Sequence, residues 1–186
     1  MGPIRAGRAV ALAAALITVP LLGPSTAVAT GGAARTGETG TKAGFRFRAS
    51  LVARHSGKCL DVERVSTRNG ADLHQWTCLD DQPNQEWNLV ATSDGYYTLR
   101  ATHSGKCLDV EGVSTRNGAN VHQWTCLDDQ PNQEWKLLQR DSGYFILVAR
   151  HSGKCLDVEN AGIDDGSGID QWTCVYGRPN QEWRLA

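Results

Sequence analysis

The chain has 186 residues, of which 19 are Lys or Arg and 20 are Asp or Glu, and its formal net charge is −1 at pH 7. This balance gives no electrostatic reason to expect nucleic acid or an anionic membrane surface as a partner. The length suits one folded domain once the N-terminal segment is set aside.

Residues 1–29 read as a secretory signal peptide. Two arginines precede an apolar run at 9–22, and the small residues at 27–29 are typical of a cleavage site. The alternative is a membrane anchor, but a bilayer core needs about 20 apolar residues, and this shorter run contains Pro20. Cleavage before Thr30 leaves 17 basic and 20 acidic residues, a charge of −3. We therefore expect a secreted, extracellular protein.

Residues 30–44 contain little that could be buried, and their composition predicts a flexible leader. One domain is expected to follow at 45–186. It divides into repeats at about 45–92, 93–140 and 141–186.

A 48-residue unit is repeated three times, with copies that start at Ala53, Ala101 and Ala149. The first 35 residues of copies one and two share 31 identities, and those of copies one and three share 21. Such a period indicates a unit that needs its sister copies to complete a core. Three equal sites suit a multivalent binder better than an enzyme, which normally has one asymmetric site.

Each copy contains short strand-like runs between turn residues, and no window has a helical period. In the first copy these runs are Leu51–His55, Cys59–Glu63, Leu73–Cys78 and Glu86–Val90. About twelve strands follow for the domain. A propeller normally has 4–8 blades, so three units favour a closed, pseudo-threefold barrel with a hairpin cap.

Six cysteines in an exported chain indicate disulfides. The repeat selects the pairs Cys59–Cys78, Cys107–Cys126 and Cys155–Cys174. Each bond would close a loop of about 20 residues and contribute roughly 3 kcal/mol. Metal ligation is the alternative, but the sequence has no CxxC pair and no His at ligand spacing from these sulfurs.

Strand alternation predicts that Leu60, Val62 and Leu73 point to the core. It also places Gln75 on that side, which the sequence does not explain. If a disulfide joins residues directly opposite one another in an antiparallel pair, Asp61 lies opposite Trp76 and Glu63 lies opposite His74.

A carboxylate beside an indole on an outer face is suited to a sugar. The C–H face of a pyranose stacks on the ring, while the hydroxyls bond to the carboxylate and to a nearby amide. The candidate residues are Asp61, His74, Trp76 and Asn84, then Asp109, His122, Trp124 and Asn132, then Asp157, Asp170, Trp172 and Asn180.

Several of these residues also have purely structural interpretations. Trp76 could belong to the core, although it shares a face with Cys78 rather than Leu73. Asp61 could cap a turn. Glutamines 85, 133 and 181 could brace the fold or contact a ligand. The core tryptophans are predicted to be Trp87, Trp135 and Trp183, and the histidines predicted to be structural are His55, His103 and His151.

These motifs resemble the ricin B-type lectins and the similar family 13 carbohydrate-binding modules. The motifs are GKCLDV at 57–62, 105–110 and 153–158, QWTC at 75–78, 123–126 and 171–174, and NQEW at 84–87, 132–135 and 180–183. The resemblance implies a β-trefoil with disulfides inside each repeat and up to three shallow sugar pockets.

By position, the resemblance implies a sugar-binding aspartate, a stacking aromatic and a terminal amide pair in each copy. The amide pairs are Asn84-Gln85, Asn132-Gln133 and Asn180-Gln181. The family often has Gln two residues before the aromatic, whereas this chain has His74, His122 and Asp170. Galactose- and xylose-type units are both expected partners.

The sequence thus predicts a secreted, non-catalytic carbohydrate-binding protein. A glycoside hydrolase or its accessory subunit is one alternative, and a protein-binding trefoil such as a protease inhibitor is another. No nucleotide loop, catalytic triad or calcium loop is present, so no cofactor or metal is expected. The third copy differs mainly at 160–170 and 175–178, which predicts a different sugar preference at the third site.

Overall fold

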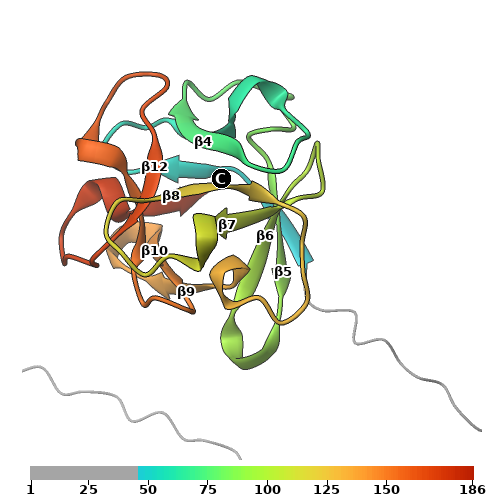
Figure 1. Cartoon of the computed structure of the whole chain (residues 1–186). Coiled ribbons are helices and arrows are strands. Elements are labelled where there is room, and N and C mark those ends of the chain that lie inside the picture. Colours follow the sequence, from blue (N-terminus) through green and yellow to red (C-terminus); the bar gives the residue numbers. More distant parts are fainter. Residues whose placement is uncertain (1–45) are drawn as a thin grey trace, which may run out of the picture. The chain divides into compact units, whose positions relative to one another are not determined.

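The computed structural model describes residues 46–186 (Figure 1). The predicted signal peptide and leader, at 1–29 and 30–44, lie outside these residues. The described part contains thirteen β-strands and seven short 3-10 helices, and no α-helix. None of its helices is long and apolar enough to cross a membrane. The predicted all-β class is confirmed.

The strands follow the three repeats in order. They are β1 (Arg46–Ala49), β2 (Leu51–Ala53), β3 (Cys59–Val62), β4 (Ala71–Trp76), β5 (Trp87–Ala91), β6 (Tyr97–Ala101), β7 (Cys107–Val110), β8 (Ala119–Trp124), β9 (Trp135–Gln139), β10 (Tyr144–Ala149), β11 (Cys155–Val158), β12 (Ile169–Trp172) and β13 (Trp183–Leu185). The 3-10 helices are η1 (Glu63–Val65), η2 (Ser93–Gly95), η3 (Glu111–Val113), η4 (Pro131–Gln133), η5 (Asp141–Gly143), η6 (Glu159–Ala161) and η7 (Pro179–Gln181).

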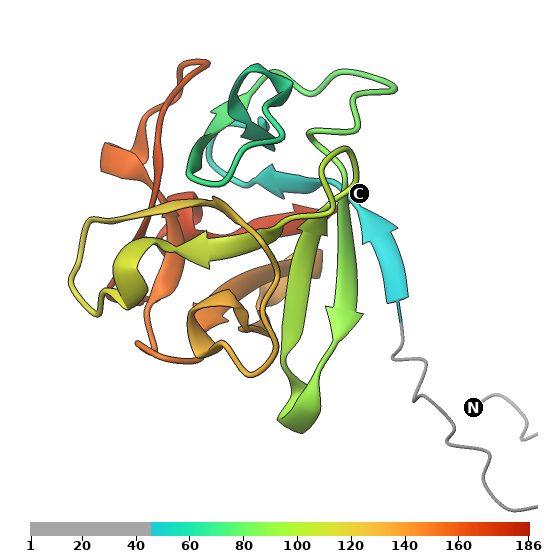
Figure 2. The ribbon, with the colours of Figure 1, turned by 45° about the vertical axis from the view of Figure 1, so that its right-hand side comes forward.

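The strands at the start and end of each repeat close a barrel. Its hydrogen-bonded neighbours are, in order, β1, β5, β6, β9, β10, β13 and β2. Figure 2 shows β1 in cyan beside the green β5–β6 hairpin. β1 and β2 are two parts of one run, broken at Ser50, whose backbone exchanges hydrogen bonds of 2.9 and 3.0 Å with Ala186. This break accounts for thirteen strands instead of twelve.

Three hairpins, β3–β4, β7–β8 and β11–β12, form the cap. Their second strands meet at the pseudo-threefold axis, since β4 pairs with β8 and β8 pairs with β12 (Figure 1). A bridge between His74 and Gly168 joins β4 to the third repeat. The architecture is the predicted β-trefoil, a barrel and cap built from three similar units.

The predicted disulfides are confirmed, but the predicted register is wrong. Cys59 bonds to Cys78, and the other copies do the same. The residue directly opposite Cys59 is Trp76, however, and Asp61 lies opposite His74. Cys78 follows the end of β4, so its Cα reaches that of Cys59 diagonally across 5.0 Å. Glu63 lies outside β3, in η1.

The core contains the apolar residues that alternation predicts. Leu60, Val62 and Leu73 are buried with their counterparts in the other repeats. Each repeat also buries one tryptophan completely, and its indole N–H donates to the carbonyl of the leucine on the adjacent cap strand. These pairs are Trp87 with Leu60, Trp135 with Leu108 and Trp183 with Leu156. The predicted core role of these tryptophans is confirmed.

Gln75, unexplained by alternation, joins two repeats. Its buried amide donates to the carbonyls of Gly162 and Asp164 and accepts from Ser56 Oγ. His55 also bonds to the Gly162 carbonyl, at 2.8 Å. Gln123 and Gln171 donate hydrogen bonds in the same way to backbone carbonyls in the loops of the first and second repeats. Each repeat therefore needs its neighbour to satisfy its buried polar groups.

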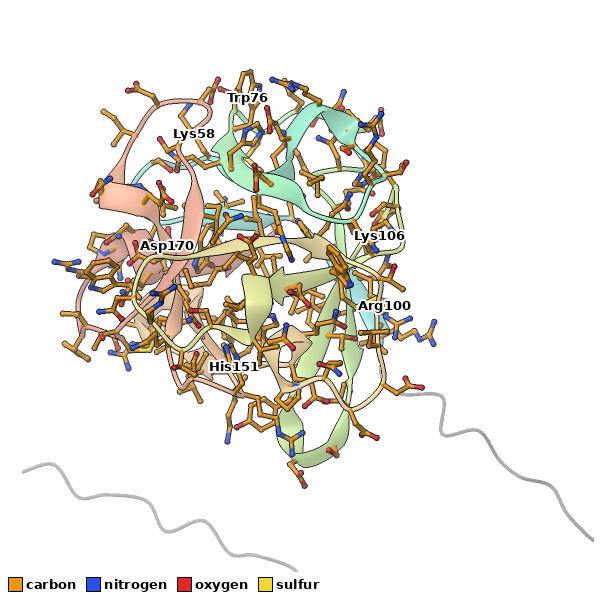
Figure 3. All side chains as sticks on the ribbon, viewed as in Figure 1. Lys58, Trp76, Arg100, Lys106, His151 and Asp170 are labelled. Atoms are coloured by element: carbon orange, nitrogen blue, oxygen red, sulfur yellow. A yellow bond between two sulfur atoms is a disulfide. The ribbon has the colours of Figure 1, made fainter. Side chains whose placement is uncertain are left out.

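The third-repeat loop keeps this contact despite its different sequence. Asp165 accepts hydrogen bonds from the Thr77 backbone and from Lys58, at 2.7 and 2.6 Å. At the other junctions, Asn69 and Asn117 accept hydrogen bonds from the backbone of the equivalent threonines. Figure 3 shows Lys58 beside this loop. The Lys58 hydrogen bond lowers the pKa of the Asp165 carboxyl.

Replacing Gln75 by alanine should destabilise the protein by roughly 2–3 kcal/mol, because two carbonyls and a hydroxyl lose their partner in a buried site. Equilibrium urea unfolding would measure the change. The exposed Gln139 on β9 provides a matched control, and Gln139→Ala should shift the midpoint little. Equal midpoints for the two variants would contradict the proposed role of Gln75 in joining repeats.

Candidate functional site

A buried carboxylate lies at the centre of each candidate site. Asp61 Oδ2 accepts hydrogen bonds from Asn84 Nδ2 and Gln85 Nε2, both at 2.9 Å, and His74 Nε2 lies 3.0 Å from Oδ1. Asp61 is only 5% exposed. A carboxylate offers about four acceptor positions, so these three donors leave one for a ligand.

The second repeat reproduces this network closely. Asp109 accepts from Asn132 and Gln133, at 3.0 and 2.8 Å, and His122 lies 3.1 Å away. The two hairpins have the same register, and this common backbone geometry explains the similarity.

The indole of each site lies at the surface, and in the first two sites it lies beside the imidazole. Trp76, Trp124 and Trp172 are each 39% exposed. The rings of His74 and Trp76 stack with centroids 5.3 Å apart and planes at 28°, and His122 and Trp124 stack at 5.5 Å and 19°. Each histidine therefore both bonds the aspartate and supports the indole. Figure 3 shows Trp76 at the edge of the molecule.

The amide pairs at the end of each pocket are buried. Gln85 is 2% exposed and also binds the Leu79 N–H and the Thr77 carbonyl, so its polar atoms are occupied within the protein. Asn84 donates to Asp61 and to the Val62 carbonyl, at 2.9 and 3.2 Å. Within the described residues its Oδ1 has no hydrogen-bond partner, and the same is true of Asn132.

The third site has two carboxylates instead of a carboxylate and an imidazole. Asp157 keeps its bonds to Asn180 and Gln181, at 2.9 and 2.8 Å, while Asp170 lies opposite it in the register. Burial, followed by the charges of Asp157 and Glu159, raises the pKa of Asp170 to about 7. Burial also raises the pKa of Asp157. This site is the most electrostatically strained of the three.

The segment after each aspartate has an unusual backbone. Arg64 and Val65 have positive φ values of 56° and 52°, and Val113 has 53°. A positive φ is costly for a β-branched residue. Such strain is found where the surrounding structure holds a binding site in place.

Cavities lie at the first and the third candidate sites. A cavity of about 870 Å³ includes Asp61, His74, Trp76 and Asn84 in its lining. One of about 540 Å³ includes Asp157, Asp170, Trp172 and Asn180, and residues from the variable loops form part of its wall. Residues 46–186 contain no cluster of three or more His, Cys, Asp or Glu side chains suited to a metal ion.

The family model for the ricin-type beta-trefoil lectin domain matches residues 45–185. The chain belongs to this lectin family. It is therefore built on a carbohydrate-binding domain. No curated protein sequence matches the chain.

The lectin domain is similar to several solved structures. ThreeFoil, a designed threefold-symmetric protein, is 52% identical with a TM-score of 0.71, over 75% of this chain and 97% of ThreeFoil. An exo-beta-1,3-galactanase from Clostridium thermocellum is 37% identical with a TM-score of 0.71, over 75% of this chain and 30% of the enzyme. The Rhizoctonia solani agglutinin, at 20% identity and a TM-score of 0.66, shares the fold over 80% of this chain and 98% of its own.

The structure places every candidate residue of the lectin domain around one of three sites, and it adds others. Arg64, Val65 and Leu79 line the first cavity. The loop positions of Val65 and Leu79 recur in each copy, and these exposed apolar side chains provide a sequence signal for a pocket wall. The support of the indole by His74 could have been predicted, because residues two apart on a strand share a face.

Proposed function

We propose that the protein is a secreted, non-catalytic lectin that binds neutral polysaccharide through three sites. The supporting observation is that each repeat places a partly exposed indole beside a buried aspartate held by an amide pair. The indole would stack on the sugar C–H face. The aspartate would accept hydroxyl hydrogen bonds.

Galactose- or xylose-type units are the proposed ligands. The galactanase similarity, at 37% identity, favours galactose-type chains among the first probes. Three disulfides are consistent with the proposed export, because such bonds persist in oxidising compartments.

The arrangement of carboxylates argues against catalysis. Glycoside hydrolysis requires two carboxylates that flank one bond. Asp157 and Asp170 are 4% and 5% exposed and lie directly opposite one another on adjacent antiparallel strands, so both carboxylates project from one face of the hairpin and would meet a ligand from the same side. We therefore expect no reducing sugar to be released when the protein is incubated with a polysaccharide panel.

A glycan array with the protein from Thr30 onward tests the proposed function. Selective binding of galactose- or xylose-containing chains, with no sugar release, is the expected result. A protein that binds no glycan but inhibits a protease would support the protein-binding alternative instead.

The third site should prefer a different sugar from the first two, because Asp170 replaces the imidazole and different loops line its pocket. Three proteins that each retain one aspartate, with the other two of Asp61, Asp109 and Asp157 changed to asparagine, would separate the sites. Calorimetric titration should give the first two sites similar monosaccharide profiles. Asp170→His should move the third profile toward theirs, and identical profiles for all three sites would refute the prediction.

A further inference from the structure

One position beside the pseudo-threefold axis has a different residue in each of the three copies. This position holds Asp72, Asn120 and Gly168 in the three copies. Each residue faces a neighbouring site, since Asp72 lies opposite His122, Asn120 lies opposite Asp170, and Gly168 forms a bridge with His74. Only the first site therefore faces a residue without a side chain.

The surroundings of the indoles show the same difference. A Cβ added to Gly70 would lie 3.8 Å from Trp124, and one added to Gly118 would lie 3.7 Å from Trp172. A Cβ at the equivalent Gly166, beside the first site, would have nothing within 4 Å. The side chain of His74 is 15% exposed, against 8% for His122. The first site is therefore more open on its axial side.

The cavities differ accordingly. The cavity of about 870 Å³ at Trp76 continues to the axis, where Asp72, Asn120, Glu159 and Gly168 line it. The cavity of about 540 Å³ at the third site has none of the three axial residues in its lining. The larger volume lies in the upper part of the range for small-molecule pockets, about 300–1,000 Å³.

We infer that the first site continues into a second sugar subsite at the axis, and so binds a neutral chain of at least two units. At the other two sites the side chains of Asp72 and Asn120 occupy the equivalent axial position. This inference rests on the proposed function, because the aspartate and indole must bind the first unit.

The axial residues have the chemistry of a hydroxyl-binding surface. Asp72 and Glu159 offer carboxylate oxygens that accept hydroxyl hydrogen bonds. Asn120 Nδ2 donates to Asp72 and Glu111, at 2.9 and 3.3 Å, which orients the Asp72 carboxylate. These negative charges would repel a uronate or a sulfated unit. The second unit should therefore be uncharged.

Gly168→Asn provides a direct test, because it copies the residue of the second repeat. Gly168 does not have a positive φ, and a Cβ there would meet mainly the movable Glu159 carboxylate, at 3.0 Å. The variant is made in a protein whose second and third sites carry Asp109→Asn and Asp157→Asn. Calorimetry then compares galactose with β-1,3-galactobiose, and xylose with xylobiose.

The protein with only the first site should bind one disaccharide about tenfold more tightly than its monosaccharide, a difference of about 1.4 kcal/mol. Gly168→Asn should remove this preference and leave monosaccharide affinity unchanged. Asp72→Ala, at an exposed position, should also reduce the preference for the disaccharide. It provides the test if the asparagine variant does not fold. Circular dichroism checks the fold of each variant.

Three outcomes separate the inference from the function on which it rests. Equal affinity for mono- and disaccharide overturns the axial subsite while monosaccharide binding persists. A disaccharide preference that survives both Gly168→Asn and Asp72→Ala also overturns it. If the protein with only the first site binds none of the four sugars, the proposed function fails there and the subsite fails with it.

Discussion

Replacing Trp76, Trp124 and Trp172 together by alanine should weaken polysaccharide binding by about 100-fold or more. Each indole is 39% exposed, and in the first two sites the imidazole stacks on one face, so the exposed part of each ring is what a sugar ring can contact. Loss of stacking at one site costs about tenfold if it removes 1.4 kcal/mol. The polymer effect is larger because several weak sites on one rigid body act together. Affinity electrophoresis in a gel that contains the polysaccharide would measure it.

A matched control separates loss of stacking from loss of apolar surface. Leu138 on β9 is also 39% exposed, and it lines neither the cavity at the first site nor the cavity at the third. Leu138→Ala should keep full affinity for the polymer. The triple variant should also keep its unfolding midpoint, because none of the three indoles is buried. Intact polymer binding by the folded triple variant would rule out the stacking model.

The sequence was most informative where one residue type repeats at a fixed interval. Cys59 and Cys78 recur with the same spacing, so the repeat favours pairing inside each copy, and the structure has that pairing. Trp87 shares the face of Leu89, and both are fully buried. The position of these two residues on the same face of the strand was sufficient to predict that both are buried.

The register could not be predicted in the same way. A disulfide requires only that the two Cα atoms lie about 4.4–6.8 Å apart. Cys78, two residues beyond the end of β4, meets this requirement at 5.0 Å without lying opposite Cys59 in the ladder. The diagonal arrangement brings His74, not Trp76, opposite Asp61. The histidine thus became the central contact of the site, a role that depends on strand pairing rather than on sequence spacing.

Contacts between repeats were also beyond the sequence. Nothing in the first copy shows that Gln75 reaches Gly162 and Asp164, because those residues follow almost two repeats later. The sequence showed that the loops of the third copy differ from those of the other two, but it did not show the effect of this difference on the first site. Gly168 lies beside His74 only because β4, β8 and β12 meet at the axis.

Changing Asp170 to asparagine should stabilise the protein at alkaline pH and have little effect at pH 4. In the folded protein the pKa of Asp170 is raised from 3.8 to about 7 by burial and by the charges of Asp157 and Glu159. The folded state therefore holds this proton more tightly than the unfolded state. The resulting stabilisation is fully present below about pH 4 and is lost as pH rises through about 7.

The difference in unfolding free energy between Asp170→Asn and wild type isolates this group from the other carboxylates. It should grow between pH 4 and pH 8 toward a limit of roughly 4 kcal/mol, the free energy that corresponds to a pKa of about 7 in place of 3.8. Guanidinium unfolding at several pH values would measure the difference. Asp128→Asn, at an exposed position, should give a nearly constant difference across the same range. If the Asp170→Asn difference is also flat, the pKa of Asp170 is the same in the folded and unfolded states, and the electrostatic distinction of the third site disappears.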